Sequence, residues 1–113
     1  MSAVTERVNE AREIALAQVR ELEELEADEN FHEWFHEHVY DMRGTYSMPT
    51  RMLVGVEIMT AGGGPTVWVS YNGNEDGTLI VTATWGADKW ETWATAPNVA
   101  AYMWELVSRE DYE

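Results

Sequence analysis

The chain has 113 residues, no cysteine and a formal net charge of −14, from 21 acidic against 7 basic side chains. This length predicts one domain over residues 1–113, and the lack of cysteine excludes disulfides, thiolate metal sites and cysteine nucleophiles. The charge argues against direct binding to nucleic acid or to an acidic membrane, and it favours a basic protein surface as the partner. No apolar run reaches the ~20 residues of a membrane span and the N-terminus lacks a signal-peptide core, so we expect a cytoplasmic protein.

Apolar side chains at three- and four-residue spacing predict a first, amphipathic helix. This stripe consists of Val4, Val8, Ala11, Ala15, Leu22 and Leu25. The next apolar group lies on the other side of the same helix axis, and comprises Phe31, Trp34, Phe35 and Met42. We therefore predict a break near residues 28–30, with Asp28 or Asn30 capping a second helix that ends near Gly44 and a connector at 45–49. One long helix that contacts different surfaces at its two ends is the alternative.

Beyond Pro49 the apolar pattern changes to period two, which predicts strands. The first strand has Met52, Val54, Val56 and Ile58 on its buried face, and others follow at 66–71, 78–85 and, short, at 89–94. A last helix is expected from Pro97 to about Arg109, with a fraying tail after it. The predicted fold class is α+β: two N-terminal helices (1–43), a three- to four-stranded antiparallel sheet (50–94) and a C-terminal helix (97–109) packed on the sheet. Most tryptophans are expected in the core, namely Trp68, Trp85, Trp90, Trp93 and Trp104.

One motif suggests catalysis: His32-Glu33-Trp34-Phe35-His36 has the H-E-x-x-H spacing of zinc hydrolases. Histidines four apart share a helix face, so His32 and His36 could bind Zn²⁺ while Glu33 activates a water molecule. A third ligand could come from Glu29, His38 or Asp41, but none stands at a family spacing, and Glu37 and His38 depart from the zincin pattern. We interpret the histidines as surface residues, expect no metal or other cofactor, and keep a small zinc hydrolase as the alternative.

The acidic residues are concentrated in the first third of the chain, where residues 1–41 hold 12 carboxylates against three arginines. The candidate partner-binding residues are Glu21, Glu23, Glu24, Glu26, Asp28, Glu29, Glu33, Glu37 and Asp41. On a helix, neighbours three or four apart lie ~5 to 6 Å from each other, comparable to the phosphate spacing of a nucleic-acid strand. Such a row predicts a partner with an Arg- and Lys-lined groove that normally holds nucleic acid. Acidity as a solubility margin or as a halophilic adaptation is the alternative.

Residues 57–69, E-I-M-T-A-G-G-G-P-T-V-W-V, together with the later Trp85-Gly86, are similar to a strand, Gly-Gly-Pro turn and strand of phage and plasmid proteins. This similarity spans roughly residues 51–107. With its small size and acidity, the chain resembles anti-CRISPR and antirestriction proteins, the phage and mobile-element proteins that mimic DNA. The resemblance implies a non-enzymatic inhibitor that occupies the nucleic-acid site of a host-defence nuclease or Cas effector in the host cytoplasm. A self-associating structural protein, paired through the stripe from Val4 to Leu25, is a third hypothesis, so a homodimer stays open.

Overall fold

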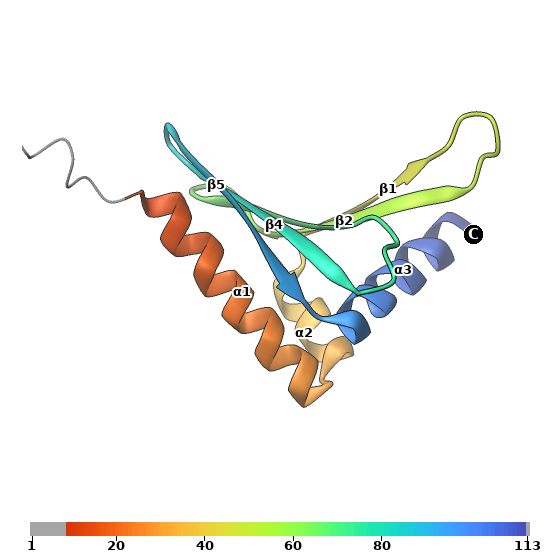
Figure 1. Cartoon of the computed structure of the whole chain (residues 1–113), viewed down its shortest axis with the longest axis horizontal. Coiled ribbons are helices and arrows are strands. Elements are labelled where there is room, and N and C mark those ends of the chain that lie inside the picture. The colour runs from red at the N-terminus through yellow and green to blue at the C-terminus, as the bar shows by residue number, and fades with distance from the viewer. Residues whose placement is uncertain (1–8, 113) are drawn as a thin grey trace, which may run out of the picture.

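The computed structural model describes residues 9–112, and side chains up to Arg109. Its elements in chain order are α1 (Glu10–Asp28), α2 (Phe31–His38), β1 (Asp41–Tyr46), β2 (Leu53–Ala61), β3 (Thr66–Tyr71), β4 (Thr78–Trp85), β5 (Asp88–Thr95) and α3 (Pro97–Tyr112). The strands form one antiparallel sheet in the order β1-β2-β3-β4-β5, and all three helices lie on the same side of it (Figure 1). The α+β class and the packing of the C-terminal helix on the sheet are confirmed. The strand number is five, not three or four.

The first helix is fixed at its start by polar contacts and along its length by burial. The Asn9 side chain accepts a hydrogen bond from the Arg12 amide at 3.0 Å, and the buried Asp88 carboxylate of β5 accepts one from the Glu10 amide at 3.3 Å. A carboxylate at this position also interacts favourably with the helix dipole. The buried stripe contains Ala11, Ala15, Leu22 and Leu25, and α1 packs with it on β4 and β5. The predicted stripe is confirmed there, while Val4 and Val8 lie outside the described residues.

The predicted break between two helices is confirmed. Glu29 adopts a left-handed conformation, with φ of 61°, and its amide donates to the Leu25 carbonyl at 2.8 Å, which ends α1. Asn30 holds the N-cap position of α2, but its side chain makes no capping hydrogen bond. The chain reverses within these two residues, so α2 returns beside the end of α1 (Figure 1).

The predicted end of the second helix near Gly44 is wrong. Val39 is already extended, and the Tyr40 amide donates to the Met59 carbonyl at 2.8 Å, which pulls the chain into the sheet. From Asp41 the backbone pairs with β2, so the supposed connector at 45–49 is instead the end of β1 and the start of a turn. Met42 fits the helical spacing by chance. A single apolar residue that faces the core is compatible with a half-buried strand as well as with a helix.

The core lies between the helices and one face of the sheet. Its buried strand residues are Val56, Ile58, Val67, Val69, Leu79, Val81, Ala83 and Ala94, and α3 adds Val99, Met103 and Val107. The remaining predicted strands are confirmed, and β5 is longer than the short strand predicted at 89–94. Trp90 pairs with Ala83 on the helix face of the sheet, and Trp93 pairs with Ile80 on the open face.

Some predicted core residues lie at the surface. Val54 is exposed because the start of β2 extends beyond β3, which begins to pair only at Val56, and Met52 is exposed in the turn before β2 begins. In the described part of the chain no tryptophan is fully buried. Trp104 is half-buried and packs against the core, as predicted, but the core role assigned to Trp85, Trp90 and Trp93 is wrong, because all three are exposed. None of the described helices combines the length and apolar character that crossing a membrane requires.

Candidate functional site

An acidic cleft of about 240 Å³ opens between α1 and α2. Its lining residues are Glu21, Glu24, Leu25, Asp28, Asn30, Glu33, Trp34, Glu37 and His38. Five of them are carboxylates, three from α1 and two from α2, and among the described residues that line the cleft there is no lysine or arginine. Negative side chains from two helices therefore converge on one concavity.

The local sequence explains why the carboxylates face each other. Glu24 and Asp28 are four residues apart on α1, and Glu33 and Glu37 are four apart on α2, so each pair lies on one face of its helix. The reversal at Glu29 then sets the two pairs on opposite sides of the cleft. The predicted single row of carboxylates is thus two short rows with a gap between them.

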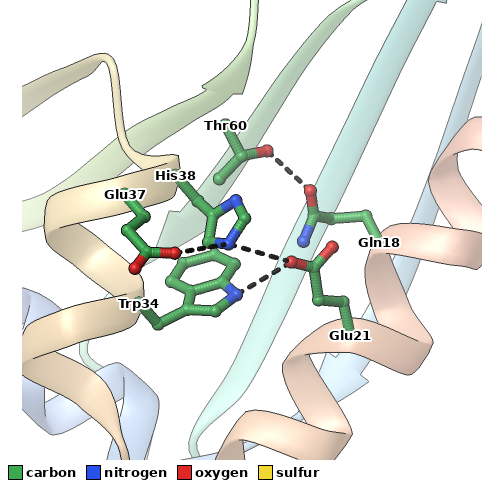
Figure 2. Close-up of polar contacts among 6 residues, drawn as sticks. All are labelled: Gln18, Glu21, Trp34, Glu37, His38 and Thr60. Atoms are coloured by element: carbon green, nitrogen blue, oxygen red, sulfur yellow. Dashed lines mark hydrogen bonds and ion pairs between the residues drawn. The ribbon is translucent and has the colours of Figure 1, made fainter.

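Glu21 holds the two helices together at the inner end of the cleft. Its Oε2 accepts a hydrogen bond from Trp34 Nε1 at 2.8 Å and lies 4.0 Å from His38 Nε2 (Figure 2). His38 Nε2 is also 3.9 Å from Glu37 Oε2, and its ring lies against the Trp34 ring with centroids 5.1 Å apart. Because a half-buried indole N–H needs an acceptor, Glu21 serves the structure of the cleft more than its outer surface.

One turn before Glu21, α1 is also tied to the sheet. The Thr60 hydroxyl of β2 donates to Gln18 Oε1 at 2.7 Å (Figure 2). Gln18 is 8% exposed, and its Nε2 is buried without a hydrogen-bond partner in the described structure. Together the Gln18 and Glu21 contacts fix the α1 side of the cleft to both β2 and α2.

The other predicted partner-binding residues lie elsewhere. Glu23 is exposed on α1 outside the cleft, and Glu29 forms the helix end described above. Asp41 is in β1, where its carboxylate accepts from the Met42 amide at 2.9 Å and pairs with Arg43 at 3.4 Å. Asp41 is therefore not part of an acidic helix.

Glu26 has a structural contact of its own. Its carboxylate oxygens accept from the Asn98 amide at 3.1 Å, the Val99 amide at 3.0 Å and the Asn98 side chain at 2.8 Å. These amides belong to the first turn of α3, whose N–H groups have no acceptor within the helix. Glu26 thus caps the last helix from the first one, and it interacts favourably with the positive end of the α3 dipole.

Three arginines of the described residues pair with acidic side chains that do not line the cleft. Arg12 pairs with Glu13 at 3.5 Å and Arg43 with Asp41, while Arg109 donates a hydrogen bond to Glu105 one turn earlier on α3. The hydrogen bond and the charge of Glu105 raise the pKa of the Arg109 guanidinium. These pairs are exposed, so they contribute little to stability, and none of them involves a carboxylate of the cleft.

The H-E-x-x-H residues are divided between two surfaces. His32 and His36 line a separate groove of about 540 Å³ between α2, β1 and α3, together with Asp41, whereas Glu33 lines the acidic cleft. Within residues 9–112, no three His, Asp or Glu side chains come together in a way that could hold a metal ion. The geometry therefore gives the zinc-hydrolase alternative no additional support.

Trp34 and His38 line the cleft but were not among the predicted partner-binding residues, although His38 was considered as a metal ligand. A tryptophan four residues before a histidine on a short helix indicates that their rings share one face, so the pair was detectable once the helix break was placed. Comparisons with protein-family models, with curated proteins and with solved structures found no significant match.

Proposed function

We propose that the chain is a non-enzymatic binding protein. The carboxylates around its acidic cleft bind a cationic, nucleic-acid-binding site on another protein, such as a host-defence nuclease in the cytoplasm. The observation that carries this proposal is the convergence of Glu24, Asp28, Glu33 and Glu37 on one cleft with no lysine or arginine lining it. No cofactor enters the proposal.

The like charges around the cleft destabilise the free chain but would stabilise a complex with a basic partner. Like charges four apart on a helix destabilise it by a few tenths of a kcal/mol per pair, and the cleft holds one such pair on each side. An Arg- or Lys-lined groove relieves this repulsion when it closes over the cleft, so the same charges that weaken the free chain stabilise the complex. A groove of this kind is built to contact phosphates spaced along a strand, and two opposed rows of carboxylates offer comparable acceptors.

The test uses the immobilised chain in a bacterial lysate at about 50 mM salt, with elution by duplex DNA instead of salt. Proteins that bind the chain through their own nucleic-acid site should be released by the duplex. Any nuclease activity of these proteins should fall when the soluble chain is added. Binding of each released protein should weaken steeply as salt rises.

The matched variants carry equal changes of net charge in different places. Glu24→Lys with Glu33→Lys reverses both sides of the cleft, whereas Glu75→Lys with Glu91→Lys reverses two exposed carboxylates outside it. We expect the cleft variant to lose at least tenfold in affinity and the control to stay within about threefold. Equal losses in the two variants would show that net charge alone causes retention, and DNA-insensitive retention would contradict the nucleic-acid site.

A further inference from the structure

The sheet has two free edges, and they differ in protection. β1 and β5 are the outer strands, so each has one side without a strand partner among the described strands. Native proteins commonly protect such edges with charged side chains, lysine above all. The only lysine of the chain, Lys89, lies exposed on β5 beside Asp88, and Glu91 follows on the same strand.

The corresponding charge on β1 does not protect the edge. The Arg43 guanidinium lies 4.4 Å from the centroid of the Trp68 ring on β3, so its side chain reaches across β2 over the open face of the sheet. A cation–π contact of this kind holds the arginine inward. Of the two charged side chains of β1, Asp41 and Arg43, the arginine is thus directed over the sheet, so this edge has no basic guard comparable to Lys89 on β5.

Exposed apolar side chains lie at both ends of this edge. Tyr40, directly before β1, is 68% exposed, and Met48, in the turn after β1, is 88% exposed. Beside Tyr40 opens the 540 Å³ groove, whose apolar lining includes Phe35, Val39 and Leu106. Met48 thus projects at the end of the edge after β1, and the groove opens at the Tyr40 end.

The charge of this region allows two copies to approach. Residues 39–54 contain Asp41 against Arg43 and Arg51, whereas the chain as a whole carries −14. Contact through any strongly acidic surface would bring like charges together, but contact through this hairpin would not.

We propose that a second copy of the chain binds this edge, so that β1 pairs antiparallel with β1 of the partner and one sheet runs through both copies. An antiparallel pair places the start of one strand beside the end of the other, which brings Met48 of each copy to the groove next to Tyr40 of its partner. Backbone hydrogen bonds give affinity and the methionine in the groove gives register. This dimer does not depend on the proposed binding of a basic partner.

The earlier alternative, pairing through the stripe of α1, does not agree with the structure. Ala11, Ala15, Leu22 and Leu25 are buried against the sheet and are not available to a second helix.

The first measurement is the molecular mass of the full chain in solution over a dilution series. We expect a concentration-dependent dimer that strengthens as salt screens the net charge, the opposite of the salt response expected for a basic partner. A monomer at every concentration up to about 0.5 mM, where even a weak dimer would be populated, would overturn the proposal.

A matched pair of variants locates the contact. Thr45→Lys on β1 and Thr95→Lys on β5 each add one lysine at an exposed threonine on an edge strand. We expect Thr45→Lys to raise the dimer Kd at least tenfold and Thr95→Lys to leave it within about threefold. Dimers that survive Thr45→Lys, or that both variants dissociate equally, would place the contact elsewhere and refute the β1 edge.

Hydrogen exchange of the unmodified chain decides the question even if Thr45→Lys does not fold. The amides of β1 should exchange more slowly at high than at low protein concentration, and those of β5 should not change. Concentration-independent exchange along β1 would contradict the proposal.

Discussion

The turn between α1 and α2 and the hairpin of β1 and β2 project from different ends of the molecule (Figure 1). The first presents carboxylates from both helices, and the second presents Tyr46, Met48 and Met52 with almost no net charge. Charge and exposed apolar surface are thus kept apart on a chain of 113 residues. This separation teaches that the acidity is densest around the two N-terminal helices, so it need not prevent a second surface from making apolar contacts.

The largest effect should come from the side chain that joins the acidic helix to the sheet. Leu22 is fully buried, and Leu22→Ala should lower the free energy of unfolding by about 3 kcal/mol through lost burial and the cavity left behind. Leu16→Ala removes the same atoms from a half-buried position on α1 and should cost about a third as much. Urea unfolding measures both, and equal losses would contradict the assignment of the buried face.

The next effect separates structural from surface carboxylates on one helix. Glu26→Ala removes the cap of α3 and should destabilise the chain by about 1 to 2 kcal/mol. Glu23→Ala, exposed on the same helix, should change the stability by less than about 0.5 kcal/mol. Thermal unfolding of both variants provides the measurement, and a neutral Glu26→Ala would show that the cap contributes nothing.

A smaller effect is expected on the hairpin. Arg43→Ala loses the contact with Trp68 and should cost about 0.5 to 1 kcal/mol. Arg51→Ala removes the same charge from the exposed hairpin turn and should be close to neutral. If urea unfolding gives equal values, the cation–π contact does not hold Arg43 inward, and the reasoning about the unguarded edge loses that support.

The smallest effect should have the opposite sign. Glu24→Gln removes one of two like charges four apart on α1, so stability should rise by a few tenths of a kcal/mol at low salt and return to the parent value at high salt. The control is Glu75→Gln, on an exposed turn outside the cleft. Unfolding at two salt concentrations tests it, and destabilisation by Glu24→Gln would mean that the carboxylate has a structural partner.

The parts of the fold that sequence could predict are those with a sustained period. The stripe of α1, three strands and the apolar face of α3 each repeat over several turns or residues, and β-branched residues reinforce the strands. β1 was missed because only Met42 and Gly44 of its six residues face the helices, which is too short a pattern to identify a strand. Its pairing with β2 is a tertiary effect.

The candidate site was predictable in composition but not in geometry. The acidic segment and the helix break were both visible in the sequence, and together they place Glu24 and Asp28 opposite Glu33 and Glu37. The role of Glu26 was not visible, because its acceptor function depends on Asn98 and Val99, which are more than 70 residues away. Nothing local distinguishes a capping glutamate from its exposed neighbours.

That contact between Glu26 and the start of α3 also bears on how the chain folds during synthesis. α1 packs mainly on β4 and β5, and its end caps α3, so its main docking surface is completed only when most of the chain has been added. Contacts this distant in sequence slow folding, since a long loop must close before they form. Most of the nascent chain should therefore remain open and accessible to chaperones and proteases, and then become ordered in one late step.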